Sequence, residues 1–193
     1  FGDVEWVPLS TFRKLTEVNV FGMIGVIKTF APLLRRAKGR IVNISSMMGR
    51  MPVAMRSPYV ISKFAVEGFS DCLRHEMKMW DVKVIVVEPG NFTAGTSIYT
   101  AEGIEKIGKE MWEGMDEEVR SAYGEELFKK KIALMKREVK NGSTDLSLVI
   151  DAIVCALTDA TPQARYQPMG LYYKTMVFAA WHLPECIYDY LYK

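Results

Sequence analysis

The stretches Arg40-Ile41-Val42-Asn43-Ile44-Ser45-Ser46 and Lys83-Val84-Ile85-Val86-Val87-Glu88-Pro89-Gly90 decide the fold of this chain. Each holds a short run rich in β-branched residues, which is typical of a β-strand, so we expect strands over 40–45 and 83–88. Four consecutive β-branched residues in the second run indicate burial on both faces. Such burial favours a parallel sheet between two layers of helices over a half-exposed antiparallel sheet.

Helical patterns precede both strands. Apolar residues recur at helical spacing over 10–37, and Gly39 is expected to end that helix. A second helix is predicted over 57–79, because the hydroxyl of Ser57 can cap it and Pro58 suits its first turn. The alternation of helix and strand predicts right-handed crossovers and a doubly wound α/β architecture with a parallel sheet.

The second half of the chain is largely helical in pattern. Residues 101–140 are rich in charge and helix formers, and the run Lys129-Lys130-Lys131 is interpreted as a solvated helix face. Thr144 or Asp145 is expected to cap a further helix that reaches Leu157. A short third strand is predicted over 164–167.

The tail over 171–193 is aromatic and apolar but is interrupted by charged residues and by Pro184. No stretch in it approaches the roughly 20 apolar residues of a membrane span. Two interpretations remain open. The tail packs within the protein or its oligomer, or it lies on a membrane surface, since tyrosine, tryptophan and lysine suit both.

Composition excludes several classes of protein. The 193 residues carry 25 Lys+Arg and 23 Asp+Glu, a net charge of +2, with 49% apolar and 25% charged residues. These values exclude disordered, collagen-like and strongly basic nucleic-acid-binding chains, and the length suits one domain. With 3 widely spaced cysteines and 2 histidines, neither a disulfide framework nor a metal site is indicated. The opening at Phe1 has no targeting pattern, so we expect the later part of a longer protein.

Candidate functional residues follow the two strands. In doubly wound sheets ligands bind beyond the carboxyl ends of the strands, where Ser46 and Pro89-Gly90 are expected. Tyr59 and Lys63 are four residues apart near the start of a helix, so they share one face. Such a pair is common by chance, and it becomes informative only together with Ser46 and Pro89-Gly90 at the same edge of the sheet.

This combination resembles a known family. Asn43-Ile44-Ser45-Ser46, Tyr59-x-x-x-Lys63 and Glu88-Pro89-Gly90, with Asn19 in the preceding helix, are similar to the motifs of the short-chain dehydrogenase/reductase superfamily. The resemblance implies a Rossmann-like fold and covers nearly the whole chain. No Gly-x-x-x-Gly-x-Gly occurs, so we expect a fold truncated at its amino-terminal half, without the helix N-terminus that would hold a cofactor pyrophosphate.

The resemblance implies roles for these residues. Tyr59 would be the general base, Ser46 would hold the substrate oxygen, and Asn19 would support a water relay. Lys63 would grip the nicotinamide ribose of NAD and, as a nearby cation, is expected to lower the pKa of Tyr59 by roughly 1–3 units. Pro89, Gly90 and Phe92 would form the nicotinamide wall.

The substrate is less well indicated. Other stretches, including Glu88-Pro89-Gly90-Asn91-Phe92 and Gly142-Ser143-Thr144-Asp145, resemble the mitochondrial 3-hydroxybutyrate dehydrogenases, which implies (R)-3-hydroxybutyrate and acetoacetate. Arg50, Arg56 and His182 are then candidates for the substrate carboxylate. Retinol and hydroxysteroid dehydrogenases are the second group that the sequence resembles. A third alternative is a catalytically silent chain that acts only in oligomer contacts.

The same resemblance implies an organisation and partners. We expect a catalytic core over 1–98, substrate-covering helices over 99–143, and a carboxyl-terminal helix, strand and tail over 144–193. The full-length protein is expected to act on a small molecule, to bind no nucleic acid, and to form a homodimer or homotetramer through its two long helices. Mitochondrial location and contact between the tail and phospholipid at a membrane surface are expectations of the same kind.

Overall fold

Three parallel strands form the centre of the molecule. The computed structural model describes residues 1–192 and places β1 (Arg40–Ile44), β2 (Lys83–Val87) and β3 (Arg165–Tyr166) in the order β1-β2-β3. Ile41 pairs with Val84, and Val87 pairs with Tyr166. The prediction of a parallel α/β sheet is confirmed, although β3 is shorter than the predicted segment.

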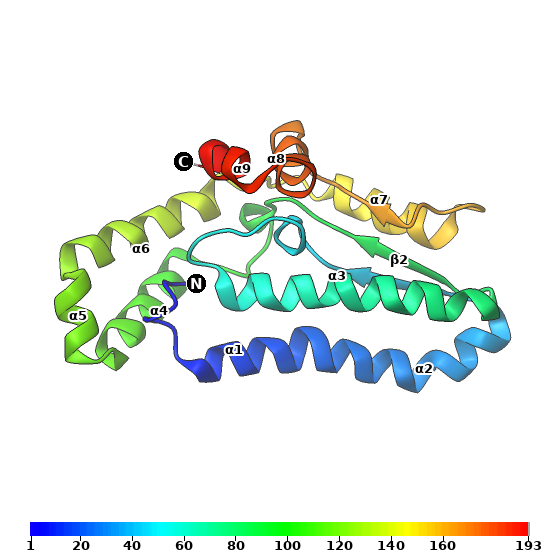
Figure 1. Ribbon diagram of the computed structural model, residues 1–193, viewed down its shortest axis with the longest axis horizontal. Coiled ribbons are helices and arrows are strands. Elements are labelled where there is room, and N and C mark those ends of the chain that lie inside the picture. Colours follow the sequence, from blue (N-terminus) through cyan, green and yellow to red (C-terminus); the bar gives the residue numbers. More distant parts are fainter. Residues whose placement is uncertain (193) are drawn as a thin grey trace.

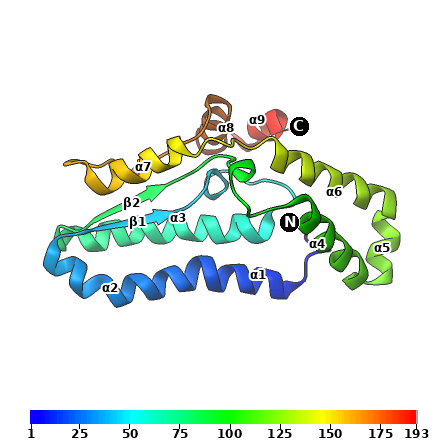
Figure 2. The ribbon, with the colours of Figure 1, turned by 180° about the vertical axis from the view of Figure 1, so that it is seen from behind.

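Helices cover both faces of this sheet. The helix α3 (Ser57–Met77), followed by a 3-10 turn over Lys78–Trp80, packs on one face, and α7 (Ser147–Thr158) packs on the other (Figures 1 and 2). Residues 84–87 of β2 are all buried, as their β-branched run predicts. The helix α7 begins later than expected, and the carboxylate of Asp145 accepts a hydrogen bond from the N–H of Ser147 in its first turn.

The first long helix is continuous but not uniform. It consists of α1 (Leu9–Thr16), a π-helical segment η1 (Glu17–Gly22) and α2 (Met23–Ala37), and it runs alongside α3 (Figure 1). The predicted end at residue 37 is confirmed. The residue that takes the left-handed conformation after it is Lys38 (φ 47°), while the N–H of Gly39 bonds to the carbonyl of Leu34.

This long helix has an apolar outer side. By length and composition it is apolar enough to cross a membrane, but it packs as a layer of this fold, with Ile27 in the core beside α3 and the sheet. Within residues 1–192, no element covers its outer side, where Val18, Phe21 and Leu33 remain exposed. Val26 and Phe30 are also exposed, but they line a groove beside the edge of β1.

Three further helices form an arm at one end of the molecule. They are α4 (Ala101–Gly114), α5 (Glu117–Tyr123) and α6 (Glu125–Lys140) (Figure 1). Trp6 of the amino-terminal segment packs into this arm against Phe128. The prediction of a solvated lysine run holds for Lys129, which pairs with Glu125 on the surface, but not for Lys131, which pairs with Asp3.

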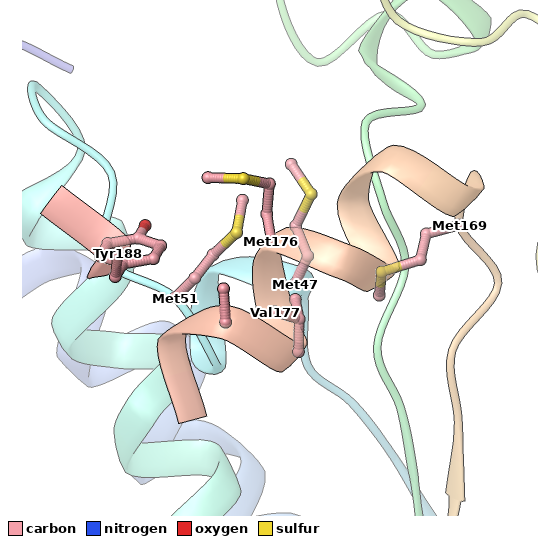
Figure 3. Packing of buried hydrophobic residues seen from close by; sticks show 7 residues of the cluster. Met47, Met51, Met169, Met176, Val177 and Tyr188 are labelled. Atoms are coloured by element: carbon pink, nitrogen blue, oxygen red, sulfur yellow. The ribbon is translucent and has the colours of Figure 1, made fainter. Parts of the chain in front are cut away.

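The carboxyl-terminal tail folds back over the carboxyl end of the sheet. It forms α8 (Leu171–His182) and α9 (Glu185–Tyr192), separated at Pro184. Its inner side packs against the segment after β1 in a methionine-rich cluster (Figure 3), whose buried members are Met47, Met51, Met169, Met176, Val177, Ala179 and Tyr188. The inner side of the tail therefore packs within the protein, which was one of the two interpretations of this segment.

Candidate active site

The site begins where β1 and β2 end. The ladder continues past both strands, because the N–H of Ser45 donates to the carbonyl of Val87 (2.8 Å) and the N–H of Met47 donates to that of Pro89 (2.9 Å). These bonds bring Ser46 and Pro89 to the same edge of the sheet, as predicted. Ser46 itself is buried, with an extended backbone, and its Oγ accepts a hydrogen bond from the N–H of Met48 (3.2 Å).

The first two turns of α3 bring Tyr59 and Lys63 to this edge. Pro58 lies in the first turn, where its missing N–H costs no helical bond. Lys63 Nζ donates to the carbonyl of Ile44 at the end of β1 (2.9 Å) and lies 5.5 Å from the centre of the Tyr59 ring. The side chain of Ser46 lies near enough to the Tyr59 hydroxyl to lower the pKa of that phenol. The structure thus brings together the three polar groups that the sequence analysis placed in one site.

The pKa of Tyr59 differs from the sequence-based expectation. Burial raises it above the ordinary value, while the side chain of Ser46 and the charge of Arg56 oppose the rise. The expectation that Lys63 lowers this pKa is wrong in this chain. Burial also lowers the pKa of Lys63, and the carboxylate of Glu67 partly offsets that effect. Tyr59 therefore favours its protonated form until a further positive charge is brought near.

Asn19 lies in the π-helical segment and reaches α3. Its Nδ2 donates to Ser62 Oγ (3.0 Å), and Ser62 Oγ donates to the carbonyl of Tyr59 (2.7 Å). Asn19 and Lys63 line the same groove, of about 470 Å³, along the edge of β1 that carries no strand among residues 1–192. Asn19 is therefore connected to the backbone of Tyr59 through Ser62.

The segment after β2 is held by the residues between β3 and α8 and by α6. The N–H of Gly90 donates to the carbonyl of Pro168 (3.1 Å), and a Cβ at Gly90 would lie 2.7 Å from that of Met169, so only glycine fits there. Phe92 is half-buried and follows directly. Asn91, which the sequence analysis did not single out, donates to the carbonyl of Glu138 in α6 (2.9 Å).

The three candidate cations for a substrate carboxylate lie in different places. The guanidinium of Arg56 lies 5.8 Å from the centre of the Tyr99 ring, and its charge acts to lower the pKa of Tyr59. Burial lowers the pKa of Arg56, and nearby phenols and a carboxylate oppose the change. Arg50 is instead engaged by Trp181 and Glu88, and His182 stacks on Phe178 at the surface. Of the three, Arg56 is the one whose charge affects the pKa of Tyr59.

An ionic network between the end of β2 and α3 was not predicted from the sequence. Glu88 is fully buried at the end of β2, where its two oxygens accept hydrogen bonds from Arg165 Nε (3.0 Å) and Gln167 Nε2 (2.6 Å). The Arg165 guanidinium also bonds Asp71 (2.7 Å) and Glu67 (3.3 Å) of α3. In the sequence, Glu67 is visible only as a glutamate on the apolar side of a helix. Its partner Arg165 is 98 residues away, so the pairing could not be predicted.

Glu67 has the most altered acidity in this network. Burial and the neighbouring Glu88 carboxylate raise the pKa of Glu67 to about 7 from an ordinary 4.5, against the effects of Ser45, Arg165 and Arg50. One of its oxygens, Oε1, is buried without a hydrogen-bond partner. The folded state therefore binds a proton at Glu67 more tightly than the unfolded state does.

Comparisons with known proteins identify the family and the fold of the chain. A family profile described as "short chain dehydrogenase" matches residues 2–104. Rat mitochondrial D-beta-hydroxybutyrate dehydrogenase is 52% identical over 192 residues, covering 100% of this chain and 56% of the relative. Human 17-beta-hydroxysteroid dehydrogenase type 6 is 36% identical (97% and 58% covered), and rat retinol dehydrogenase 7 is 41% identical (86% and 51% covered).

A solved structure is similar over most of the chain. The crystal structure of a short-chain dehydrogenase from Streptomyces avermitilis is 25% identical with a TM-score of 0.69, over 98% of this chain and 62% of the other. A short-chain dehydrogenase from Burkholderia cenocepacia in complex with NADP has a TM-score of 0.64 at 19% identity, which shows the same fold. The chain spans about half the length of the curated relatives it matches.

The acidity of Glu67 predicts a pH-dependent stability. Below an unfolded-state pKa of 4.5 both states hold the proton, and as pH rises toward 7 only the unfolded state releases it. The full-length protein should therefore lose at most about 3 kcal/mol of unfolding free energy from this group between pH 4.5 and 8. Urea unfolding at several pH values should show this loss, and Glu67→Gln should make the unfolding free energy less dependent on pH.

Glu76→Gln, at an exposed position on the same helix, should not change the pH profile of stability. An unchanged profile in Glu67→Gln would contradict the assignment.

Proposed function

The chain belongs to the short-chain dehydrogenase family, and on this basis we propose that the full-length protein transfers hydride between a nicotinamide dinucleotide and a secondary alcohol. The observation that carries the proposal is the convergence of Ser46, Tyr59 and Lys63 at the shared carboxyl edge of β1 and β2. A hydroxyl, a phenol and an ammonium at one edge are the groups that the removal of a proton from an alcohol needs.

The roles of the residues follow from their contacts. Ser46 holds the substrate oxygen, and the Tyr59 phenolate accepts the hydroxyl proton as the substrate carbon loses hydride. In the reverse direction the protonated phenol returns that proton to the carbonyl oxygen of the substrate. Burial of Tyr59 favours this protonated form. Asn19 keeps the first turn of α3 in place through Ser62 and supports the water relay that the family resemblance implies.

The residues present fit a nicotinamide cofactor, which we propose is NAD. Bound NAD supplies the hydride acceptor and an additional positive charge. Lys63 Nζ and the Tyr59 hydroxyl offer hydrogen-bonding groups suited to ribose hydroxyls, and Lys63 faces the groove along β1. Pro89, Gly90 and Phe92 form the wall on the other side, fixed by the bonds that hold this segment to the residues between β3 and α8 and to α6.

We propose (R)-3-hydroxybutyrate as the alcohol and acetoacetate as the product. The support is the 52% identity to D-beta-hydroxybutyrate dehydrogenases together with Arg56, whose charge acts on the pKa of Tyr59 and suits a small carboxylate. In this arrangement residues 1–98 are the catalytic core, 99–143 cover the substrate, and 144–193 carry the last helix, strand and tail. The alternatives are a retinol or hydroxysteroid substrate, or a silent chain that acts only in oligomer contacts.

Removal of the Tyr59 hydroxyl tests the proposed chemistry. In the full-length protein, Tyr59→Phe should lower kcat by roughly 10²- to 10⁴-fold, because it removes the proton acceptor, with dinucleotide binding retained. Turnover is followed by the absorbance of the reduced nicotinamide, and binding by calorimetry. Tyr190→Phe, at an exposed tyrosine of α9, should leave turnover unchanged. Undiminished kcat in Tyr59→Phe would overturn the assignment, and absence of dinucleotide binding in the unaltered protein would favour the silent chain.

Neutralisation of Arg56 tests the substrate. Arg56→Gln should raise KM for 3-hydroxybutyrate by roughly 10- to 100-fold, as expected for the loss of a charge-assisted hydrogen bond. Arg36→Gln, at an exposed position of α2, is the matched control. The same assays with retinol and a hydroxysteroid distinguish the alternatives. A full-length protein that oxidises either of these and not 3-hydroxybutyrate would show that the proposed substrate is wrong.

Two exposed apolar surfaces support proposals about partners. The outer side of the long helix exposes Val18 and Phe21, and we propose that it forms the contact of a homodimer or homotetramer. The outer side of α8 exposes Leu171, Tyr172 and Phe178, which suits phospholipid at a membrane surface. A mitochondrial location is proposed from the relatives that carry that word in their names.

One pair of variants distinguishes these two surfaces, each serving as the control for the other. Phe21→Glu should reduce the number of subunits measured by sedimentation velocity without weakening binding to phospholipid vesicles. Leu171→Glu should weaken vesicle co-sedimentation and leave the number of subunits unchanged, because a charge is costly at an apolar contact. If either variant changes neither property, the corresponding surface has been assigned wrongly.

A further inference from the structure

The loop over 47–56 connects Ser46 to the helix that carries Tyr59, and its backbone is held by the tail. The carbonyl of Arg50 accepts a hydrogen bond from Trp181 Nε1, and the carbonyl of Pro52 accepts one from the Tyr188 hydroxyl (2.7 Å). The N–H of Ala54 donates to the Tyr192 hydroxyl (2.8 Å). Three alternate residues of the loop thus find partners in aromatic side chains more than 130 residues away in the sequence.

The side chain of Arg50 connects the same tail to the end of β2. Its guanidinium carbon lies 3.4 Å from the centre of the Trp181 ring, a close cation–π contact. Its Nε lies 3.8 Å from an oxygen of the fully buried Glu88, the residue before Pro89. Since Glu88 is already held by Arg165 and Gln167, Arg50 connects α8 to a fixed anion beneath the site.

Apolar packing adds to these polar contacts. Met47 and Met51 of the loop are buried against Met176, Val177 and Tyr188 of the tail (Figure 3). Methionine side chains adapt to irregular gaps, so this cluster by itself allows more than one arrangement of the loop. The hydrogen bonds and the stacked guanidinium are directional, and they select one arrangement.

We propose that Trp181, Tyr188 and Arg50 are positioning residues, through which α8 and α9 clamp the loop over 47–56 and hold Ser46 and Arg56 in place for the substrate. This inference rests on the proposed function for its kinetic consequence, whereas the clamp itself has a readout that needs no activity. Arg50 acts here through the loop and does not contact the substrate carboxylate.

Kinetics of single variants in the full-length protein test the clamp. Tyr188→Phe removes one hydroxyl and should raise KM for the alcohol substrate roughly 2- to 10-fold, as expected for one lost hydrogen bond, with kcat and dinucleotide affinity changed less than twofold. Trp181→Leu should have a larger effect than Trp181→Phe, which keeps a ring for Arg50. A merely structural role would lower the active fraction, and hence kcat, without changing KM.

The controls match the variants in exposure and chemistry. Trp80, 46% exposed against 48% for Trp181, also carries an arginine over its ring, so Trp80→Leu should leave KM unchanged. Tyr190→Phe is the control for Tyr188→Phe. If Tyr188→Phe and Trp181→Phe both leave KM unchanged, the proposal is wrong, and these two variants decide the matter even if Trp181→Leu does not fold.

Limited proteolysis gives the readout that does not depend on activity. Trypsin should cut after Arg50 and Arg56 at least several-fold faster in Trp181→Leu and Tyr188→Phe than in the unaltered protein or in Trp80→Leu, with fragment masses identifying the sites. Equal cleavage rates would overturn the clamp. Faster cleavage in a protein that oxidises no 3-hydroxy acid would support the clamp and contradict the proposed substrate.

Discussion

The parallel pairing of β1 with β2, continued by two backbone hydrogen bonds beyond the strands, is the constraint on which the rest of the structure depends. It places Ser46 and Pro89 side by side, and the carbonyl of Ile44 at the end of β1 then receives the Lys63 ammonium. A shift of one residue in this register would exchange the two faces of β2 and separate Ser46 from the helix that carries Tyr59. The fold and the candidate site therefore share one cause.

The ionic network around Arg165 and the pair of Tyr59 and Lys63 differ in how their side chains are held. Glu88, Glu67, Asp71 and Arg165 form a buried network in which the partners are fixed by mutual hydrogen bonds. Tyr59 and Lys63, like Glu67 in the network, are pushed by burial toward their neutral forms. Residues of this kind respond strongly to a charge that enters the site, which suits groups that must exchange a proton with a bound molecule. The network supplies rigidity, and the paired phenol and ammonium supply the chemistry.

Much of the fold could be predicted because its signals are local. The β-branched run of β2, the helical spacing over 10–37 and Pro58 at the start of α3 each act over a few residues, and the structure confirms the elements that they indicate. The shared edge of Ser46, Tyr59 and Lys63 followed from the parallel order of the strands. The prediction for the pKa of Tyr59 failed because it counted one neighbouring charge and not the loss of solvent, which is the larger effect.

By itself the sequence determined the order of the elements, the parallel sheet and the residues that gather at its carboxyl edge, since hydrophobic periodicity and turn chemistry are properties of short segments. Only the tertiary structure decided which arginine influences Tyr59 through its charge. Arg50 and Arg56 lie in one loop, and the sequence does not distinguish them. Trp181 and the buried Glu88 engage Arg50, whereas the charge of Arg56 acts on the Tyr59 phenol. Those partners are distant in the chain, and packing alone brings them to the loop.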